Sequence, residues 1–267
     1  MRLLVINPNI SEEVTALIRA EALRSSGPST ELVVSTAAYG VEYIETRFEA
    51  LVAAGAVAEI IAEHKGQVDG VVVAAFGDPG MPALKELTDV PVVGITEAAL
   101  CAAALQGQRF SIIAISDRIT AWYRDCVERF GFGGRLASIR SIKQALGGIG
   151  TVQEDFRATL VELAVEAVAE DGADVIILAG APLAGLARQV RGEIPVPVVD
   201  GIGAGVRLTE ALVGLASGPH RTGAFAAPPV KAHHGLSPAL NAALGAAQAR
   251  MGKRKEPALA SGEAADH

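Results

Sequence analysis

Five short turns carry most of the groups in this chain that could bind or transform a small ligand. Each turn follows a short apolar segment, and the turns span residues 7–9, 75–80, 94–97, 116–117 and 180–185. They offer backbone N–H groups, and Asn9, Ser11, Thr96 and Ser116 could add side-chain donors. Donors gathered at one place suit a small anion, such as a carboxylate or an enolate that forms during a reaction.

Asp78, in the segment VVVAAFGDPG at 71–80, is the acid closest to these donors. It could act as a general base, or accept a hydrogen bond from a substrate N–H. It could instead cap a helix that begins near Pro79, since proline is common at the first helical position. Both interpretations stay open.

Three further acids could face the same region. Glu45 and Glu97 stand at the expected starts of helices, where a solvated acid is an equally good interpretation. Asp200 ends an apolar segment, where it could bind substrate or bridge two parts of the fold.

The elements around these turns predict an α/β fold. Runs rich in Val, Ile and Leu alternate with longer stretches of helical pattern, which is typical of parallel sheets covered by helices on both faces. Strands are expected at 3–7, 31–35, 70–75, 90–94, 110–115, 137–141, 175–179 and 196–200, and helices at 11–25, 45–64, 95–106, 117–130, 151–171 and 202–216.

The chain also contains an internal repeat. DGVVVAAFGDPG from residue 69 aligns with DVIILAGAPLAG from residue 174, which pairs Ala75 with Gly180. PVVGI from 91 aligns with PVVDGI from 197, and RLLVIN from 2 resembles RFSIIAI from 109. Three ordered matches at nearly one spacing predict two similar lobes, with a ligand between them at the carboxyl ends of the strands.

The expected division gives a first lobe of residues 1–97 and 207–250 and a second lobe of residues 98–206. Residues 251–267 are predicted to form a disordered tail, because they are small, charged and interrupted by proline.

Composition narrows the class of protein. The 267 residues carry a net charge of −7, so a nucleic-acid or anionic-membrane surface is not expected. The two cysteines show no disulfide framework or zinc spacing, and no apolar run is long enough for a membrane span, which favours a cytoplasmic protein. His233 and His234 lack neighbouring acids or cysteines, so no metal site is expected.

The turns resemble those of the aspartate/glutamate/hydantoin racemase superfamily, most closely its hydantoin and allantoin racemase branch. The matching segments are INPNIS at 6–11, GVEYIE at 40–45, FGDPG at 76–80, GITEAA at 94–99, GADVIILAGAPLAG at 172–185, PVVDGIGAGV at 197–206 and APPVKAHHGL at 227–236. The resemblance implies two Rossmann-like lobes related by a pseudo-twofold axis, a small-molecule substrate in the inter-lobe cleft, no cofactor and a homo-oligomer. Substrate-binding residues are then expected at Asn9, Ser11, Glu45, Phe76, Gly77, Thr96, Ser116, Ala181 and Pro182.

One departure from the family pattern concerns the chemistry. Racemases that resemble this chain carry a cysteine just before FGDPG and a second one in the 172–185 motif, and these thiols exchange the α-proton from opposite faces of the substrate. This chain has Ala75 and Gly180 there, while Cys101 and Cys126 fall within helical patterns and are expected to be buried structural residues. A mechanism with two thiols is therefore not expected.

The favoured prediction is an enzyme that acts on a small carboxylate, ureide or cyclic amide through an anion-stabilising cleft. Without the thiols, lyase or hydrolase chemistry is favoured, with catalysis assigned to Asp78 and to the positions of Ala75 and Gly180. One alternative is a true racemase that uses groups other than cysteine. Another is a binding protein without catalytic activity.

Overall fold

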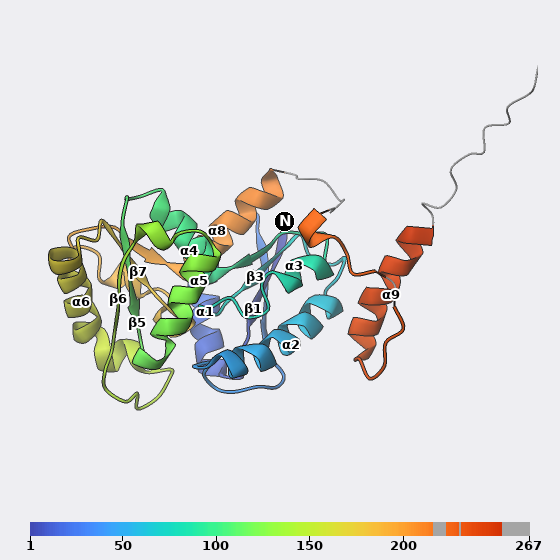
Figure 1. Cartoon of the computed structure of the whole chain (residues 1–267), viewed down its shortest axis with the longest axis horizontal. Helices are drawn as coiled ribbons and strands as arrows, with labels where there is room; N and C mark the ends of the chain where they lie inside the picture. The colour runs from blue at the N-terminus through green and yellow to red at the C-terminus, as the bar shows by residue number, and fades with distance from the viewer. Residues whose placement is uncertain (216–222, 230, 253–267) are drawn as a thin grey trace, which may run out of the picture.

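The computed structural model describes residues 1–215, 223–229 and 231–252 and contains two parallel sheets of four strands each (Figure 1). The first sheet has the order β2 (Glu31–Thr36), β1 (Arg2–Asn7), β3 (Gly70–Val73) and β4 (Val92–Gly94). The second has the order β6 (Leu136–Ser141), β5 (Phe110–Ala114), β7 (Val175–Leu178) and β8 (Val198–Asp200).

The two sheets repeat one pattern of pairing. Val73 of β3 lies beside Gly94 of β4, and Leu178 of β7 lies beside Asp200 of β8. The internal repeat aligns these same residues in the sequence, Val73 with Leu178 and Gly94 with Asp200. The predicted α/β fold with two similar lobes is confirmed.

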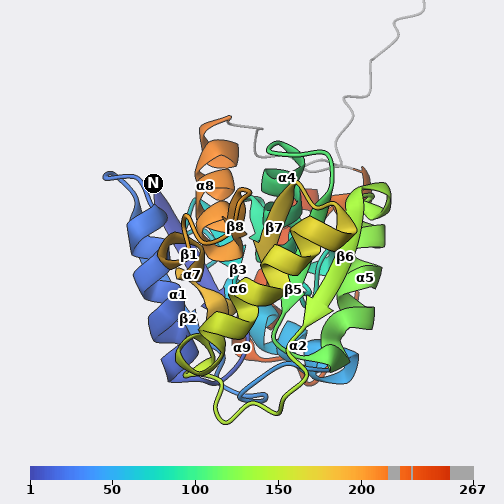
Figure 2. The ribbon, with the colours of Figure 1, turned by 90° about the vertical axis from the view of Figure 1, so that its left-hand side faces the viewer.

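Helices cover both faces of the sheets. The six helices that correspond to those expected from the sequence are α1 (Glu12–Ser25), α2 (Arg47–Glu63), α4 (Ile95–Ala104), α5 (Thr120–Arg129), α6 (Val152–Asp171) and α8 (Gly201–Gly214). In Figure 1, α6 covers the second sheet at the left and α2 lies against the first sheet at the right, and Figure 2 shows α6 crossing the face of the second sheet. α8 follows β8 of the second sheet but packs against α1, α4 and β3.

Two hydrophobic cores explain why the strand sequences are apolar without alternation. The larger core includes Val72 of the first sheet and Ile177 of the second, so the sheets share one continuous interior. The smaller core packs Val71 of the first sheet against α2. Strands buried on both faces need apolar side chains at every position.

Three helices were not expected from the sequence: α3 (Ala83–Leu87), α7 (Leu186–Gln189) and α9 (Pro238–Gly252). α3 and α7 are too short to give a helical period. α9 ends at Gly252, and the remainder of the predicted tail lies outside the described residues. The lobe boundaries stay predictions.

Among the described residues, no helix combines the length and the apolar character that crossing a membrane requires. Cytoplasmic location and oligomeric state stay predictions.

Candidate active site

Ala75 and Gly180 occupy equivalent places in the two sheets. Each stands two residues beyond the last residue of a strand, Val73 of β3 and Leu178 of β7. Ala75 is 8% exposed. Gly180 is half-buried and has φ +115°, a conformation that residues with a side chain rarely adopt. Neither position carries a group that could move a proton.

The FGDPG turn after β3 is held by aromatic residues of α5. The ring of Phe76 packs against Tyr123, with 4.6 Å between the ring centroids. Gly77 has φ +106°, and a Cβ atom there would lie 2.2 Å from the Trp122 ring. Glycine is therefore required at Gly77 both by the backbone conformation and by the close approach of the indole.

Asp78 joins this turn to the start of α4. Its carboxylate accepts hydrogen bonds from the backbone N–H groups of Thr96 at 2.8 Å and Glu97 at 2.9 Å. The backbone of Asp78 has φ +46°, and the residue is 1% exposed. The sequence suggested a cap for a helix near Pro79, which is wrong, because α3 begins at Ala83 and Asp78 binds the N-terminus of a later helix.

Burial raises the pKa of Asp78 to about 7, while the backbone donors of Glu97 and Thr96 oppose the rise. A pKa near neutrality would suit a general base. However, both carboxylate oxygens are engaged by backbone N–H groups, so the geometry gives Asp78 a positioning role.

Thr96 completes the same junction from the other side. The backbone N–H of Gly77 donates to the Thr96 hydroxyl at 2.6 Å, and Thr96 is fully buried. The neighbouring Glu97 forms an ion pair with Lys85 at 2.7 Å. Thr96 and Asp78 together fix the turn after β3 against the first residues of α4.

Asp200 does the corresponding work in the second sheet. One oxygen accepts from Ile202 and Gly203 at the start of α8, and the other accepts from Gly185 at 2.5 Å. Burial raises the pKa of this carboxyl as well. In both lobes one aspartate ties the turn after the third strand to the helix after the fourth strand. Asp78 lies in the turn, whereas Asp200 lies at the end of the fourth strand.

Glu45 and Ser116 link the two lobes directly. The Ser116 hydroxyl donates to the Glu45 carboxylate at 2.7 Å, which joins the loop after β2 to the loop after β5. Both residues are half-buried. Of the acids expected near the cleft, Glu45 is therefore the one whose carboxylate accepts a hydrogen bond from a side chain of the other lobe.

Tyr43 lies next to this contact and was not among the residues expected to bind substrate. Its hydroxyl is buried and, among the described residues, has no hydrogen-bond partner. Burial, with smaller effects of Glu45 and Glu49, raises the pKa of Tyr43 far above its usual value, so the phenol stays protonated. The hydroxyl is therefore a buried donor for which the described residues supply no acceptor. Its signal in the sequence was the rarity of tyrosine, with only three in the chain.

Asn9 and Ser11 organise the turn after β1. The Asn9 side chain accepts from Asn7 at 2.8 Å and from the backbone N–H of Ser11 at 2.9 Å. The Ser11 hydroxyl caps α1 by accepting from the N–H of Val14 at 3.3 Å. These contacts use the acceptor groups of both side chains for the turn itself.

On the second-sheet side, Ala181 and Pro182 are buried in a single 3₁₀ turn, Ala181–Leu183. Gln153 of α6 donates to the carbonyl of Pro182 at 2.8 Å and to that of Ala184 at 3.0 Å. The turn after Gly180 is thus fixed from outside by α6.

Both cysteines of the chain lie within helices and are at least half-buried. Cys126 is fully buried and lies behind the FGDPG turn, where its thiol is 3.5 Å from the carbonyl of Gly77. Burial raises its pKa to about 12, which keeps it protonated. Cys101 is half-buried in α4, and burial raises its pKa too.

A cavity of about 270 Å³ lies beside the FGDPG turn and is lined by residues that include Asp78, Trp122 and Arg129. Asp78 borders it with only 1% of its surface exposed, so the cavity does not free the carboxylate for catalysis. Within the described part of the chain, no three His, Cys, Asp or Glu residues gather in a way that could hold a metal ion.

Comparison with known proteins gives a consistent match. A family model described as Asp/Glu/Hydantoin racemase matches residues 3–209. The hydantoin racemase of Paenarthrobacter aurescens is 39% identical over 220 residues, which cover 80% of this chain and 92% of the relative.

Solved structures give a similar result. The allantoin racemase from Klebsiella pneumoniae superposes with a TM-score of 0.85 at 36% identity, covering 90% of this chain and 98% of that one. Unliganded arylmalonate decarboxylase matches with a TM-score of 0.56 at 20% identity, over 80% of this chain and 92% of that one. This second likeness concerns the fold alone.

Proposed function

The chain belongs to the Asp/Glu/hydantoin racemase family, and on that premise we propose that it is an isomerase that inverts the α-carbon of a small cyclic ureide. The substrate class is that of the hydantoin and allantoin named for its relatives. The observation that carries the proposal is the likeness to a hydantoin racemase across 92% of that protein's length.

This proposal differs from the prediction made from the sequence, which placed lyase or hydrolase chemistry ahead of racemisation. Lyase or hydrolase chemistry was favoured there because Ala75 and Gly180 carry no thiol. The comparisons do not support that preference and favour its alternative, a racemase that works with groups other than cysteine.

Such a reaction needs three contributions. A base must remove the proton from the carbon next to the ring carbonyl, hydrogen-bond donors must stabilise the enolate that forms, and a proton must return from the opposite face. The donors at the strand ends suit the enolate, since the fold holds them in place before the reaction begins.

We assign the base to Glu45. Its carboxylate is half-buried and held by Ser116 at 2.7 Å, which supports a fixed position between the lobes. The carboxylate has a second oxygen with which to accept the substrate proton. The Tyr43 hydroxyl, buried and without a protein partner among the described residues, is assigned as a donor to the enolate oxygen.

The returning proton is assigned to water. A Cβ atom at Gly180 would meet nothing closer than Pro182 at 3.5 Å, so the missing side chain leaves room on that side of the turn. The α-proton removed by Glu45 passes to solvent, and the enolate takes a proton from the water. No atom or electron is lost or gained in this exchange.

The test is to incubate the protein in deuterium oxide with (S)-allantoin, with an L-5-alkylhydantoin and, separately, with an arylmalonate. The expected result is loss of optical rotation together with deuterium at the α-carbon, faster than in a control with heat-denatured protein. Ring opening, or release of carbon dioxide from an arylmalonate, without α-exchange would identify a hydrolase or a lyase. Saturable binding without turnover would identify a binding protein, and each of these outcomes would overturn the proposal.

A further inference from the structure

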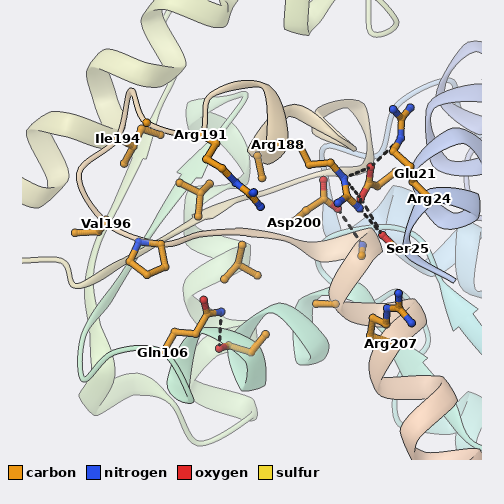
Figure 3. A pocket seen from close by; sticks show the side chains of 18 of the residues that line it. Glu21, Arg24, Ser25, Gln106, Arg188, Arg191, Ile194, Val196, Asp200 and Arg207 are labelled. Carbon is orange, nitrogen blue, oxygen red and sulfur yellow. Dashed lines mark hydrogen bonds and ion pairs between the residues drawn. The ribbon is translucent and has the colours of Figure 1, made fainter. Parts of the chain in front are cut away.

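The largest cavity among those described contains none of the residues predicted for catalysis. It has a volume of about 870 Å³ and lies along the outer edge of β8, between that strand, α1, α4, α7 and α8 (Figure 3). Its walls therefore come from β8 of the second sheet and from helices that pack on both sheets. The cavity is too large to be a packing defect and has a chemical character of its own.

Arginine dominates the charged part of the lining. Four arginines border the cavity: Arg24 of α1, Arg188 of α7, Arg191 just after α7 and Arg207 of α8. This concentration of positive charge stands out in a chain whose net charge is −7. Figure 3 shows Arg188 and Arg191 on one side of the cavity and Arg207 on another.

The two acids in the lining are already engaged. Glu21 is 2% exposed, and its carboxylate receives the Arg188 guanidinium at 2.6 Å. Asp200 accepts three backbone N–H groups, as described above. Neither acid is available to neutralise Arg191 or Arg207.

Arg191 is the group that lacks a partner. Within the part of the chain that the structure describes, its guanidinium makes no hydrogen bond or ion pair. Arg207 reaches only Glu210, on its own helix, at 3.2 Å and is 59% exposed. A guanidinium presents paired N–H donors that match carboxylate and phosphate oxygens, so Arg191, and those donors of Arg207 that Glu210 does not engage, can bind an anion.

Much of the remaining lining is apolar and includes Ile194, Val196 and Val198, while Gln106, just after α4, adds an amide. Pro195 and Pro197 precede β8 at this edge and offer no N–H groups for pairing with another strand. The chemistry thus fits a small molecule better than an added β-strand.

We propose that this cavity binds a small organic anion that carries at least two negative charges on a short apolar skeleton. Arg191 and Arg207 hold the charged groups, and the wall formed by Ile194, Val196 and Val198 contacts the skeleton. This site is separate from the catalytic one and does not depend on the reaction proposed above.

The position of the site gives binding a structural consequence. Glu21 and Arg188 join α1 to α7 across the cavity, and Asp200 joins its wall to Gly185. A ligand that spans Arg191 and Arg207 adds a further connection between α8 and the segment after α7. The ligand is therefore expected to stabilise the folded protein.

The test uses calorimetric titration and thermal unfolding with succinate, with inorganic phosphate and with uncharged succinamide, at one fixed ionic strength. Variants are Arg191→Ala and Arg207→Ala, and the matched control is Arg124→Ala, which removes an exposed arginine of α5. We expect succinate to bind and raise the Tm of the natural protein, and succinamide to do neither. Each cavity variant should weaken binding about tenfold or more, while the control should change it less than about twofold.

Binding of phosphate but not of succinate would show that the site selects phosphate, and would overturn the proposal of an organic anion with an apolar skeleton. An equal loss in Arg124→Ala would show general attraction to charge, and unchanged affinity in both cavity variants would place the anion elsewhere. Because Arg191 is exposed and unpaired, Arg191→Ala should unfold at the same temperature as the natural protein without ligand. A misfolded variant is thereby distinguished from a lost site.

Discussion

The carboxylate of Asp78 fills the space in which a side chain at Gly94 would have to lie. A Cβ atom on Gly94 would be 2.1 Å from the Asp78 Cγ and less than 2.5 Å from both of its oxygens. The two residues come from separate strand ends, so the glycine of β4 is what allows the acid of the FGDPG turn to reach the N-terminus of α4. In the second sheet the place of Gly94 is taken by Asp200 itself.

Gly94→Ala should therefore destabilise the fold. The added methyl group must displace the Asp78 carboxylate and leave the N–H groups of Thr96 and Glu97 unpaired, which we expect to cost about 2–4 kcal/mol. Urea unfolding would measure the free energy of unfolding. Gly134→Ala is the control, because a Cβ atom there meets nothing within 4 Å, and a cost equal to that of the control would contradict the close contact.

Stability should fall as the pH rises from about 4 to about 7, through the titration of Asp78. Burial raises its pKa to about 7 in the folded protein, whereas a carboxyl of an unfolded chain titrates near 4. Between these values the folded state holds a proton that the unfolded state has lost, so the contribution is full below about pH 4 and is lost by pH 7.

Comparison of the natural protein with Asp78→Asn isolates this effect, because the amide does not titrate and Asp200 is present in both. Urea unfolding at pH 5.0, 6.0 and 7.5, which spans the raised pKa of Asp78 of about 7, should give a steeper decline in the free energy of unfolding for the natural protein. Parallel pH profiles would mean that Asp78 does not titrate in this interval.

Glu45→Gln should lower kcat for α-proton exchange by about 10²-fold or more, the contribution typical of a general base. Glutamine keeps the length of the side chain and an oxygen for Ser116, so the loop should stay in place. Glu42→Gln, at an exposed position three residues earlier, is the matched control. Retained exchange in Glu45→Gln with normal folding would remove Glu45 from the mechanism.

Tyr43→Phe should reduce exchange about tenfold while leaving the free energy of unfolding unchanged or slightly higher. The hydroxyl is buried without a partner among the described residues, so its removal relieves a cost in the free protein and removes a donor from the reaction. The partly exposed Tyr39→Phe serves as the control. A variant with full activity would show that the hydroxyl does not contact the substrate.

Cysteines introduced at Ala75 and Gly180 should differ in their effect on stability. Ala75 needs no change of backbone, and Ala75→Cys should fold with nearly the natural Tm. Gly180 has φ +115°, so Gly180→Cys should lose about 1–3 kcal/mol. Gly180→Ala, measured in parallel, should lose a similar amount, because the strain comes from the backbone; equal stability of all three variants would contradict it.

The fold could be predicted from the sequence because its signals are local. A strand buried on both faces requires an apolar run, and all eight expected strands are present with ends shifted by a few residues. The repeat also aligned Ala75 with Gly180 correctly, since duplicated lobes keep the same spacing between strand and turn. The short helices α3 and α7 gave no such signal, because their five and four residues do not complete a hydrophobic period.

The roles of the polar residues could not be predicted in the same way. Glu45 and Ser116 are 71 positions apart, and Asp78 caps a helix whose first donors lie 18 and 19 positions later. Local pattern placed the Asp78 cap at Pro79 because that was the nearest helix start the sequence offered.

The sequence by itself thus determined the strands, their duplication and the absence of thiols at the two strand ends. The tertiary structure decided that Asp78 and Thr96 serve the scaffold, that Glu45 meets Ser116 between the lobes, and that arginines of three separate helices and the segment after α7 border one cavity. The physical reason is the range of the interactions. Hydrophobic burial along a strand depends on the types of consecutive residues, which the sequence shows directly. A hydrogen bond or a charge cluster depends on which distant segments the packed core brings within about 3 Å of each other.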